Sequence, residues 1–159
     1  PSTADKEKIS VGAEWQRRYR AMKRWRDDPT EENFWCVVLA YAGIKFKTYS
    51  GLPFTYEVLK GRNGEYTKEL WIDRREKSKS LAWSSVLLAL GNIKEKVVER
   101  PKALGDIRGV TYIYGMFYRF GLIDMPKEVK EKKNDRGNKK QKKGREDMLE
   151  ENIKFFRRL

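Results

Sequence analysis

The chain has 159 residues, of which 36 are Lys or Arg and 23 are Asp or Glu, so its net charge at neutral pH is +13. It contains no histidine and one cysteine, Cys36, which excludes an internal disulfide framework, zinc sites built on His or Cys within the chain, and catalysis by Ser-His or Cys-His pairs. The positive charge favours a polyanionic partner, nucleic acid first and an anionic membrane surface second.

Length and hydropathy also limit the number of domains and the expected location of the protein. Aromatic residues make up 13% of the chain, enough for a real core in one domain. No run of about 18 apolar residues predicts a membrane span, and the polar stretch Pro1–Ser10 does not read as a signal peptide. We therefore expect a cytoplasmic or otherwise intracellular protein, not a secreted one. The sequence predicts no cofactor and no metal, and the neighbours of Cys36 predict a buried, structural thiol.

The N-terminal part predicts a flexible lead-in over residues 1–12 and then a helix over residues 13–26. Trp15, Tyr19, Met22 and Arg26 recur at helical spacing and form an aromatic stripe that ends in a basic residue. The other faces carry a dense set of cations, which could lie along phosphates: Arg17, Arg18, Arg20, Lys23 and Arg24. The competing interpretation is a surface helix with a solvated basic back.

A second helix and a three-stranded meander follow. Thr30 is a good N-cap, and Gly43 is expected to end the helix that it starts. Period-two alternation predicts strands over residues 45–49, 54–59 and 65–73. The loop 61–64 supplies Gly and Asn at a hairpin tip.

The segment after the meander predicts a helix over residues 81–90, capped by Ser78 or Ser80. Its apolar residues leave almost no polar face, so we expect it to be central in the core. Free backbone N–H groups, hydroxyls and cations at its start would form a cradle for one backbone phosphate. The cradle would comprise Arg74, Arg75, Lys77, Ser78, Lys79 and Ser80. An ordinary capped helix with solvated lysines explains the same residues.

The sheet offers a second way to read nucleic acid, since two-stranded ribbons enter the DNA major groove and aromatics on a sheet stack on unpaired bases. The available cations are Lys45, Lys47, Arg62 and Lys68, with Tyr66 and Trp71 beside them. Plain core packing of these two aromatics is the alternative. Three strands followed by a helix resembles the arm-binding domains of tyrosine recombinases and AP2-type DNA-binding domains, a resemblance in the order of elements alone. A recognition helix over residues 79–90, with the hairpin as a wing, is disfavoured by Trp83 and the leucines.

The C-terminal third begins with an aromatic helix over residues 110–120, stopped by Gly121, and closes the globular domain at residue 126. Residues 127–145 form a basic, low-complexity tether that cannot fold alone. Residues 146–159 regain amphipathic helical spacing, so this terminal helix is expected to bind a protein partner or dock back on the domain. The tether cations expected to add non-specific affinity are Lys139, Lys140, Lys142, Lys143 and Arg145.

Taken together, the sequence predicts an α+β fold: a three-stranded antiparallel meander packed by several helices, with the basic tether and terminal helix appended. We expect a non-catalytic nucleic-acid-binding protein, with DNA favoured over RNA because a hairpin followed by a helix suits a duplex groove. The first alternative is an assembly subunit of a nucleoprotein complex. The second is a metal-dependent nuclease that uses carboxylates of the sheet, Glu69 and Asp73 above all.

Overall fold

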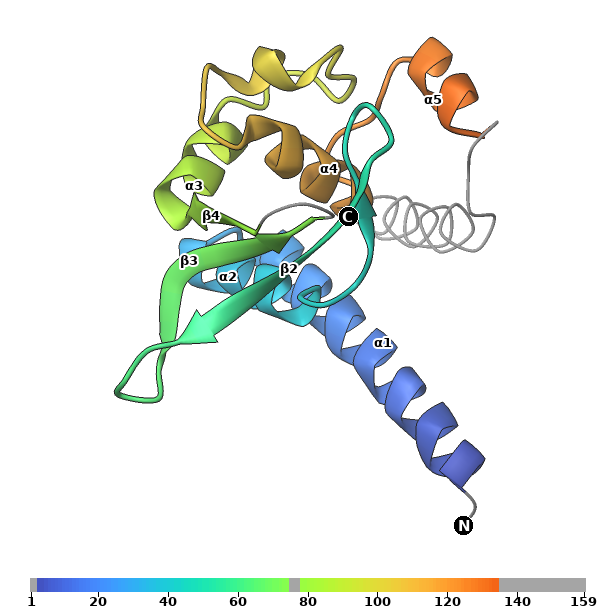
Figure 1. Ribbon diagram of the computed structural model, residues 1–159, viewed down its shortest axis with the longest axis vertical. Coiled ribbons are helices and arrows are strands. Elements are labelled where there is room, and N and C mark those ends of the chain that lie inside the picture. The colour runs from blue at the N-terminus through green and yellow to red at the C-terminus, as the bar shows by residue number, and fades with distance from the viewer. Residues whose placement is uncertain (1–2, 75–77, 135–159) are drawn as a thin grey trace.

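The fold is one antiparallel sheet with helices packed against it. The computed structural model describes the backbone of residues 3–74 and 78–134, and the side chains of residues 12–74 and 78–131. Within them the strands form a four-stranded sheet in the order β1-β2-β3-β4, and α2 lies behind that sheet in the view of Figure 1. The predicted α+β class is confirmed.

The sheet contains the three predicted strands and one more. β1 (Phe46–Lys47), β2 (Pro53–Lys60) and β3 (Tyr66–Asp73) lie where the alternation placed them, although β1 is only two residues long. The fourth strand, β4 (Lys79–Ala82), pairs antiparallel with β3 and sets Leu81 opposite Leu70. Because Leu81 and Ala82 merge into the mostly apolar segment 81–90, the sequence pattern assigned them to the following helix. The meander therefore has four strands, not three.

Two helices precede the sheet. α1 (Thr3–Asp27) begins ten residues before the predicted start, and its first half extends away from the body in Figure 1. α2 (Glu31–Ala40) is capped as predicted, since the Thr30 hydroxyl accepts a hydrogen bond from the Asn33 amide at 3.2 Å. α2 ends before Gly43, whose φ of 86° lies in the turn that leads to β1. Met22 and Ala21 of α1 are buried in the core, and Phe34 and Val38 of α2 are fully buried there.

The core is built around α4 (Val110–Phe120), which is helical as predicted and is ended by Gly121 at a φ of 77°. Its buried Phe120 packs on Phe34 and Phe46, joining α4 to α2 and β1. The main chain of α4 approaches β1 so closely that a Cβ at Gly115 would lie 2.4 Å from the Lys47 carbonyl oxygen. Only glycine fits at that contact.

The remaining segments differ from expectation in two places. α3 (Trp83–Gly91) buries Trp83, Val86 and Ala89, but Leu88 is 57% exposed, so the prediction of a central helix is wrong. After the 3-10 helix η1 (Pro101–Leu104), the chain forms α4 and then α5 (Lys127–Asn134), which is helix where the tether was predicted. A Lys130–Asp124 ion pair at 2.7 Å ties α5 to the domain. In the part of the chain described, no helix is both long and apolar enough to span a membrane.

Candidate nucleic-acid interface

The groove between α1 and α2 is lined by three of the predicted phosphate-binding arginines. Arg17, Arg20 and Arg24 recur at i, i+3 and i+7 on α1, so they share one helix face, and they line the groove together with residues of α2. The groove has a volume of about 330 Å³, and Ala13 and Ala21 keep its α1 wall low. Its α2 wall is formed by Cys36, Leu39 and Ala40.

The cations on this face are not neutralised by the chain as described. Arg17, Arg20, Lys23 and Arg24 are all exposed. None of the four makes an ion pair or a hydrogen bond within residues 12–74 and 78–131. The groove residues themselves include no carboxylate. An unpaired row of guanidinium groups over a shallow groove is an arrangement that suits successive phosphates of a backbone.

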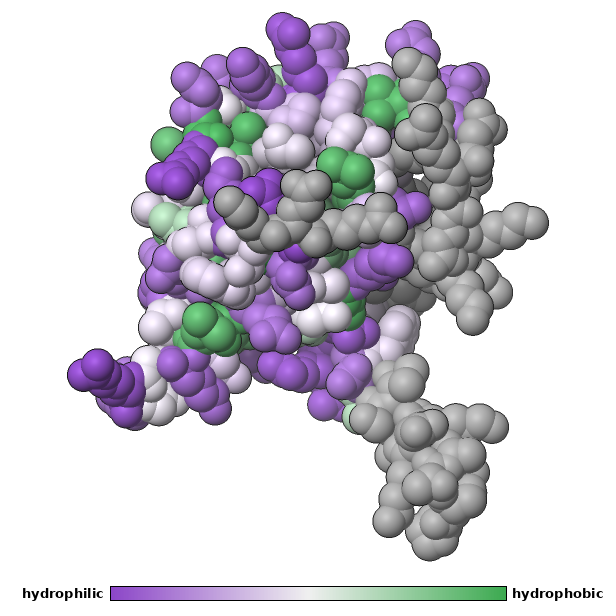
Figure 2. Space-filling model, viewed as in Figure 1, coloured by the Kyte–Doolittle hydropathy of each residue, from purple (hydrophilic) through white to green (hydrophobic). Residues whose placement is uncertain are grey.

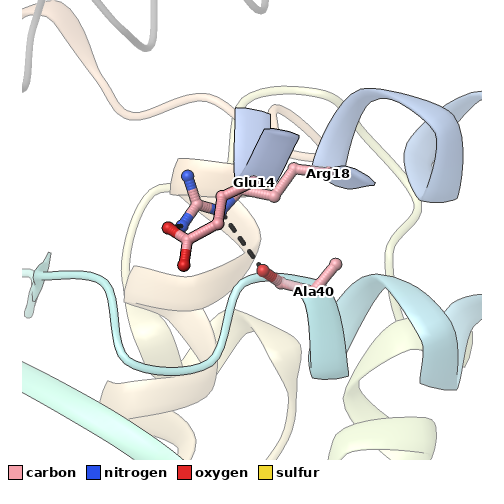
Figure 3. Close-up of polar contacts among 3 residues, drawn as sticks. All are labelled: Glu14, Arg18 and Ala40. Carbon is pink, nitrogen blue, oxygen red and sulfur yellow. Dashed lines mark hydrogen bonds and ion pairs between the residues drawn. The ribbon is translucent and has the colours of Figure 1, made fainter. Parts of the chain in front are cut away.

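Arg18 lies between them in sequence but does something different. Its Nε donates a hydrogen bond to the Ala40 carbonyl oxygen at 3.2 Å, at the C-terminal end of α2, and one of its terminal nitrogens approaches Glu14 at 3.4 Å (Figure 3). A cation at a helix C-terminus is favoured by the helix dipole. Arg18 is thus a structural link between α1 and α2, and Arg17 reaches the smaller pocket beside it, of about 250 Å³.

The predicted phosphate cradle at the start of α3 is not formed. Lys79 and Ser80 belong to β4, and α3 begins only at Trp83, with no side-chain cap. The Ser80 hydroxyl donates to the Glu69 carboxylate, and Ser78 precedes the strand as an exposed residue. Arg74 donates to the Tyr112 hydroxyl at 2.5 Å. Arg75 and Lys77 lie outside the described residues.

The side chains of the sheet that were predicted to bind nucleic acid differ in their contacts and exposure. Lys68 lies 4.0 Å above the Trp35 ring and 5.7 Å from that of Trp83, so its charge serves a cation–π contact with the core edge. Trp71 and Tyr66 are 38% and 46% exposed, which makes the core-packing interpretation of both wrong. Lys45 and Arg62 are exposed, and Lys47 is partly buried.

The open face of the sheet carries acidic side chains around Trp71. The pairing sets Glu57 opposite Trp71 and Thr55 opposite Asp73, and it places Glu69 on the same face two residues before Trp71. All three carboxylates are exposed. Carboxylates repel the phosphates of a nucleic-acid backbone, so this face is less suited to one than the α1–α2 groove. Figure 2 shows hydrophobic side chains in small, separate patches on the face of the molecule that it draws.

The nuclease hypothesis finds no metal centre in the residues that the structure describes. Among them, no group of three or more Asp, Glu or Cys side chains lies close enough together to hold a metal ion. Glu69 and Asp73 stand on either side of Trp71 in β3, and Glu69 is hydrogen-bonded to Ser80. That hydrogen bond links Glu69 of β3 to Ser80 of β4.

Two features of the α1–α2 region were missed by the sequence analysis. Cys36 is a free thiol that is partly exposed in the groove, so the prediction of a buried cysteine is wrong. The second is a set of basic residues around the buried Tyr41, namely Arg18, Arg26 and Arg119. Burial raises the pKa of Tyr41 to about 12, and the three neighbouring guanidinium charges oppose that rise. The only signal in the sequence was a lone arginine, Arg119, within an otherwise aromatic helix.

Two predicted features lie outside the described residues. They are the terminal helix 146–159 and the cations of the tether, Lys139, Lys140, Lys142, Lys143 and Arg145.

Comparison with family models, with curated proteins and with solved structures gives no match to this chain. The resemblance to arm-binding and AP2-type domains is also weakened, because β4 stands between the meander and α3.

Proposed function

We propose that this protein binds nucleic acid without chemistry, DNA in preference to RNA, through the arginine-lined groove between α1 and α2. The observation that carries the proposal is the row Arg17, Arg20 and Arg24, exposed and without an ion-pair partner in the described chain. The three side chains span about 10 Å along the helix, at 1.5 Å per residue. They would bind backbone phosphates, with Lys23 beside them and the basic C-terminal tract adding affinity without sequence preference.

The preference for DNA rests on shape. The β2–β3 hairpin projects from the body on a different side from α1 in Figure 1, and its tip bears Lys60 and Arg62. A helix along one backbone and a basic hairpin reaching a second backbone would suit a duplex.

The test is a set of binding titrations with short duplex DNA, single-stranded DNA and RNA, at about 50 and about 200 mM salt. The variant carries Arg17→Gln, Arg20→Gln and Arg24→Gln together, since glutamine keeps helix propensity while removing charge. We expect duplex binding to weaken about 100-fold at the lower salt. The slope of log affinity against log salt should also become shallower, by about 0.9 for each phosphate that the variant no longer neutralises.

The matched control removes the same charge elsewhere. Lys94→Gln, Lys96→Gln and Arg100→Gln alter three exposed cations that make no ion pair in the described chain. At about 200 mM salt the control should weaken binding by no more than about threefold, because charges beyond about 8 Å are then largely screened. At about 50 mM salt the control should lose clearly less affinity than the groove variant. Equal losses in both triple variants would show that net charge alone binds the polymer, and the groove would then have no special role.

An assembly subunit of a nucleoprotein complex is the second candidate. It is favoured by exposed apolar side chains on β2 and β3, since Leu59, Tyr66 and Trp71 are 49%, 46% and 38% exposed. Weak and equal binding to all three nucleic acids, unaffected by the groove variant, would support this candidate over the first.

A further inference from the structure

Two helices, α1 and α4, bring basic side chains to one buried phenol at the end of α2. Tyr41 follows the last residue of α2 and is only 3% exposed, with its ring 4.9 Å from that of Phe120. The Arg18 guanidinium from α1 lies 6.0 Å from the Tyr41 ring centre. Arg26 from α1 and Arg119 from α4 are close enough for their charges to act on the same phenol. We call Arg18, Arg26, Arg119 and Tyr41 the Tyr41 cluster.

Polar atoms of the Tyr41 cluster lack partners. The Tyr41 hydroxyl and one terminal nitrogen of Arg119 are buried and make no hydrogen bond in the described chain. The other deeply buried tyrosines are satisfied: Tyr56 donates to the Val38 carbonyl at 2.6 Å, and Tyr114 donates to the Val98 carbonyl at 2.5 Å. Buried polar groups are nearly always hydrogen-bonded, so each exception needs an explanation.

The charge of the Tyr41 cluster is also out of balance. Within the described residues its carboxylate partner is Glu14, which meets Arg18 at 3.4 Å and is itself 61% exposed. Burial lowers the pKa of both Arg26 and Arg119, because desolvation disfavours the charged guanidinium. A buried cation without a counter-ion is costly, and the cost is removed when an anion with several acceptor oxygens enters.

We propose that the Tyr41 cluster is a binding site for one phosphate-type oxyanion. The guanidinium groups of Arg18, Arg26 and Arg119 would supply charge and paired N–H donors, and the Tyr41 hydroxyl would donate one further hydrogen bond. Tetrahedral oxyanions match guanidinium geometry with two parallel hydrogen bonds, whereas chloride offers a single acceptor. The site does not depend on the proposed function, because Arg17, Arg20 and Arg24 are not part of it.

The experiment titrates inorganic phosphate into the full 159-residue chain and follows the arginine Nε–Hε resonances by NMR, with the melting temperature as a second readout. Chloride at equal ionic strength controls for screening, and acetate tests for a carboxylate ligand. A dinucleoside monophosphate tests whether the phosphate can come from a nucleic-acid backbone. We expect saturable shifts of Arg18, Arg26 and Arg119 with phosphate and a melting temperature that rises with its concentration.

Two variants test the assignment, and one controls for it. Tyr41→Phe removes only the hydroxyl and should weaken phosphate binding about tenfold, as expected for one hydrogen bond to a charged group. Arg119→Met should abolish the saturable shifts. Arg108→Met, in an exposed loop position, should change neither readout.

Equal responses to phosphate and chloride would overturn the proposal. So would a stronger response to acetate, or an unchanged phosphate affinity in Tyr41→Phe. If Arg119→Met fails to fold, Tyr41→Phe still decides the matter. Saturable phosphate binding in a protein that does not bind DNA would leave the Tyr41 cluster in place and would remove the proposed function instead.

Discussion

The α1–α2 groove and the open face of the sheet present opposite chemistry to a polyanion. The groove is lined by Arg17, Arg20 and Arg24 and by no carboxylate, whereas the open face sets Glu57, Glu69 and Asp73 around Trp71. Both belong to a chain whose net charge is +13. Composition can therefore indicate a class of partner without showing where on the surface that partner binds. Pairing affects location, because a cation that is held by neighbours within the fold is less accessible to the backbone of a polymer.

The engaged cations make this point within the folded domain. Arg18 binds the end of α2, Lys68 lies over Trp35, and Arg74 donates to Tyr112. Each was a candidate for phosphate binding on sequence alone, and each has a partner inside the fold. The exposed arginines of the groove have none in the described chain, which is why the proposal rests on them.

The largest effect on stability is expected from Gly115→Ala. This variant tests the close contact between α4 and β1, by which α4 covers one face of the sheet while the other face stays open. The new Cβ would lie 2.4 Å from the Lys47 carbonyl oxygen and 3.1 Å from the Phe54 ring, so α4 and β1 must separate. We expect a decrease of about 2–4 kcal/mol in the free energy of unfolding, measured by chemical denaturation.

Gly12→Ala is the matched control, since a Cβ at Gly12 of α1 would meet no atom within 4 Å. It should raise stability by about 0.5–1 kcal/mol, because alanine favours the helix. A Gly115→Ala protein as stable as the wild type would mean that α4 and β1 are not held in this close contact.

The next largest effect is expected on the pH dependence of stability, through Tyr41 at the end of α2, the helix that forms one wall of the groove. Its folded-state pKa of about 12 exceeds the ordinary value of 10.0, so the stability due to the protonated phenol is complete below pH 10. That contribution falls as the pH rises from 10 to 12, by about 1.4 kcal/mol per pH unit. In phosphate-free buffer, Tyr41→Phe should therefore lose less stability than wild type between these pH values.

The comparison with wild type is needed because buried Tyr56 and Tyr114 also have raised pKa values and remain in both proteins. At pH 7 the Tyr41→Phe protein should be at least as stable as wild type, since the deleted hydroxyl has no partner in the described chain. Identical alkaline unfolding curves would contradict the burial of this phenol.

The smallest effect is expected at the open face. Glu57→Gln, Glu69→Gln and Asp73→Asn together should change DNA affinity by no more than about threefold at about 200 mM salt, where distant charges are screened. The measurement is the same titration used for the groove variant. A gain above about tenfold would place this face against the polymer, and the contrast between the two regions would then have no functional meaning.

Much of the fold followed from local patterns that tertiary contacts do not override. Thr30 caps α2, the Gly61–Gly64 loop joins two alternating strands, and Gly121 ends α4 as predicted. β4 was missed because four residues that merge into an apolar run carry no period of their own. Its existence depends on pairing with β3, which is a non-local contact.

The candidate site was predictable only in part. The arginines of α1 were recognised as a set, but helical spacing alone did not separate Arg18 from Arg17 and Arg20, since their difference arises from where α2 ends. Core packing was one interpretation of Trp71 and Tyr66, yet both side chains are more than a third exposed. Arg119 gave no sign of its neighbours, because its partners come from α1 and α2.

The Arg18–Ala40 hydrogen bond has a mechanical consequence. α1 has 25 residues, which makes it a rod of about 37 Å. The buried contacts of its described part, at Ala21 and Met22, lie in its last two turns. The rod is therefore held near one end, and Arg18 acts as a brace close to the support. A force applied near the free end would be multiplied by leverage at this brace, so a polymer gripping the outer turns of α1 would pull first on the end of α2.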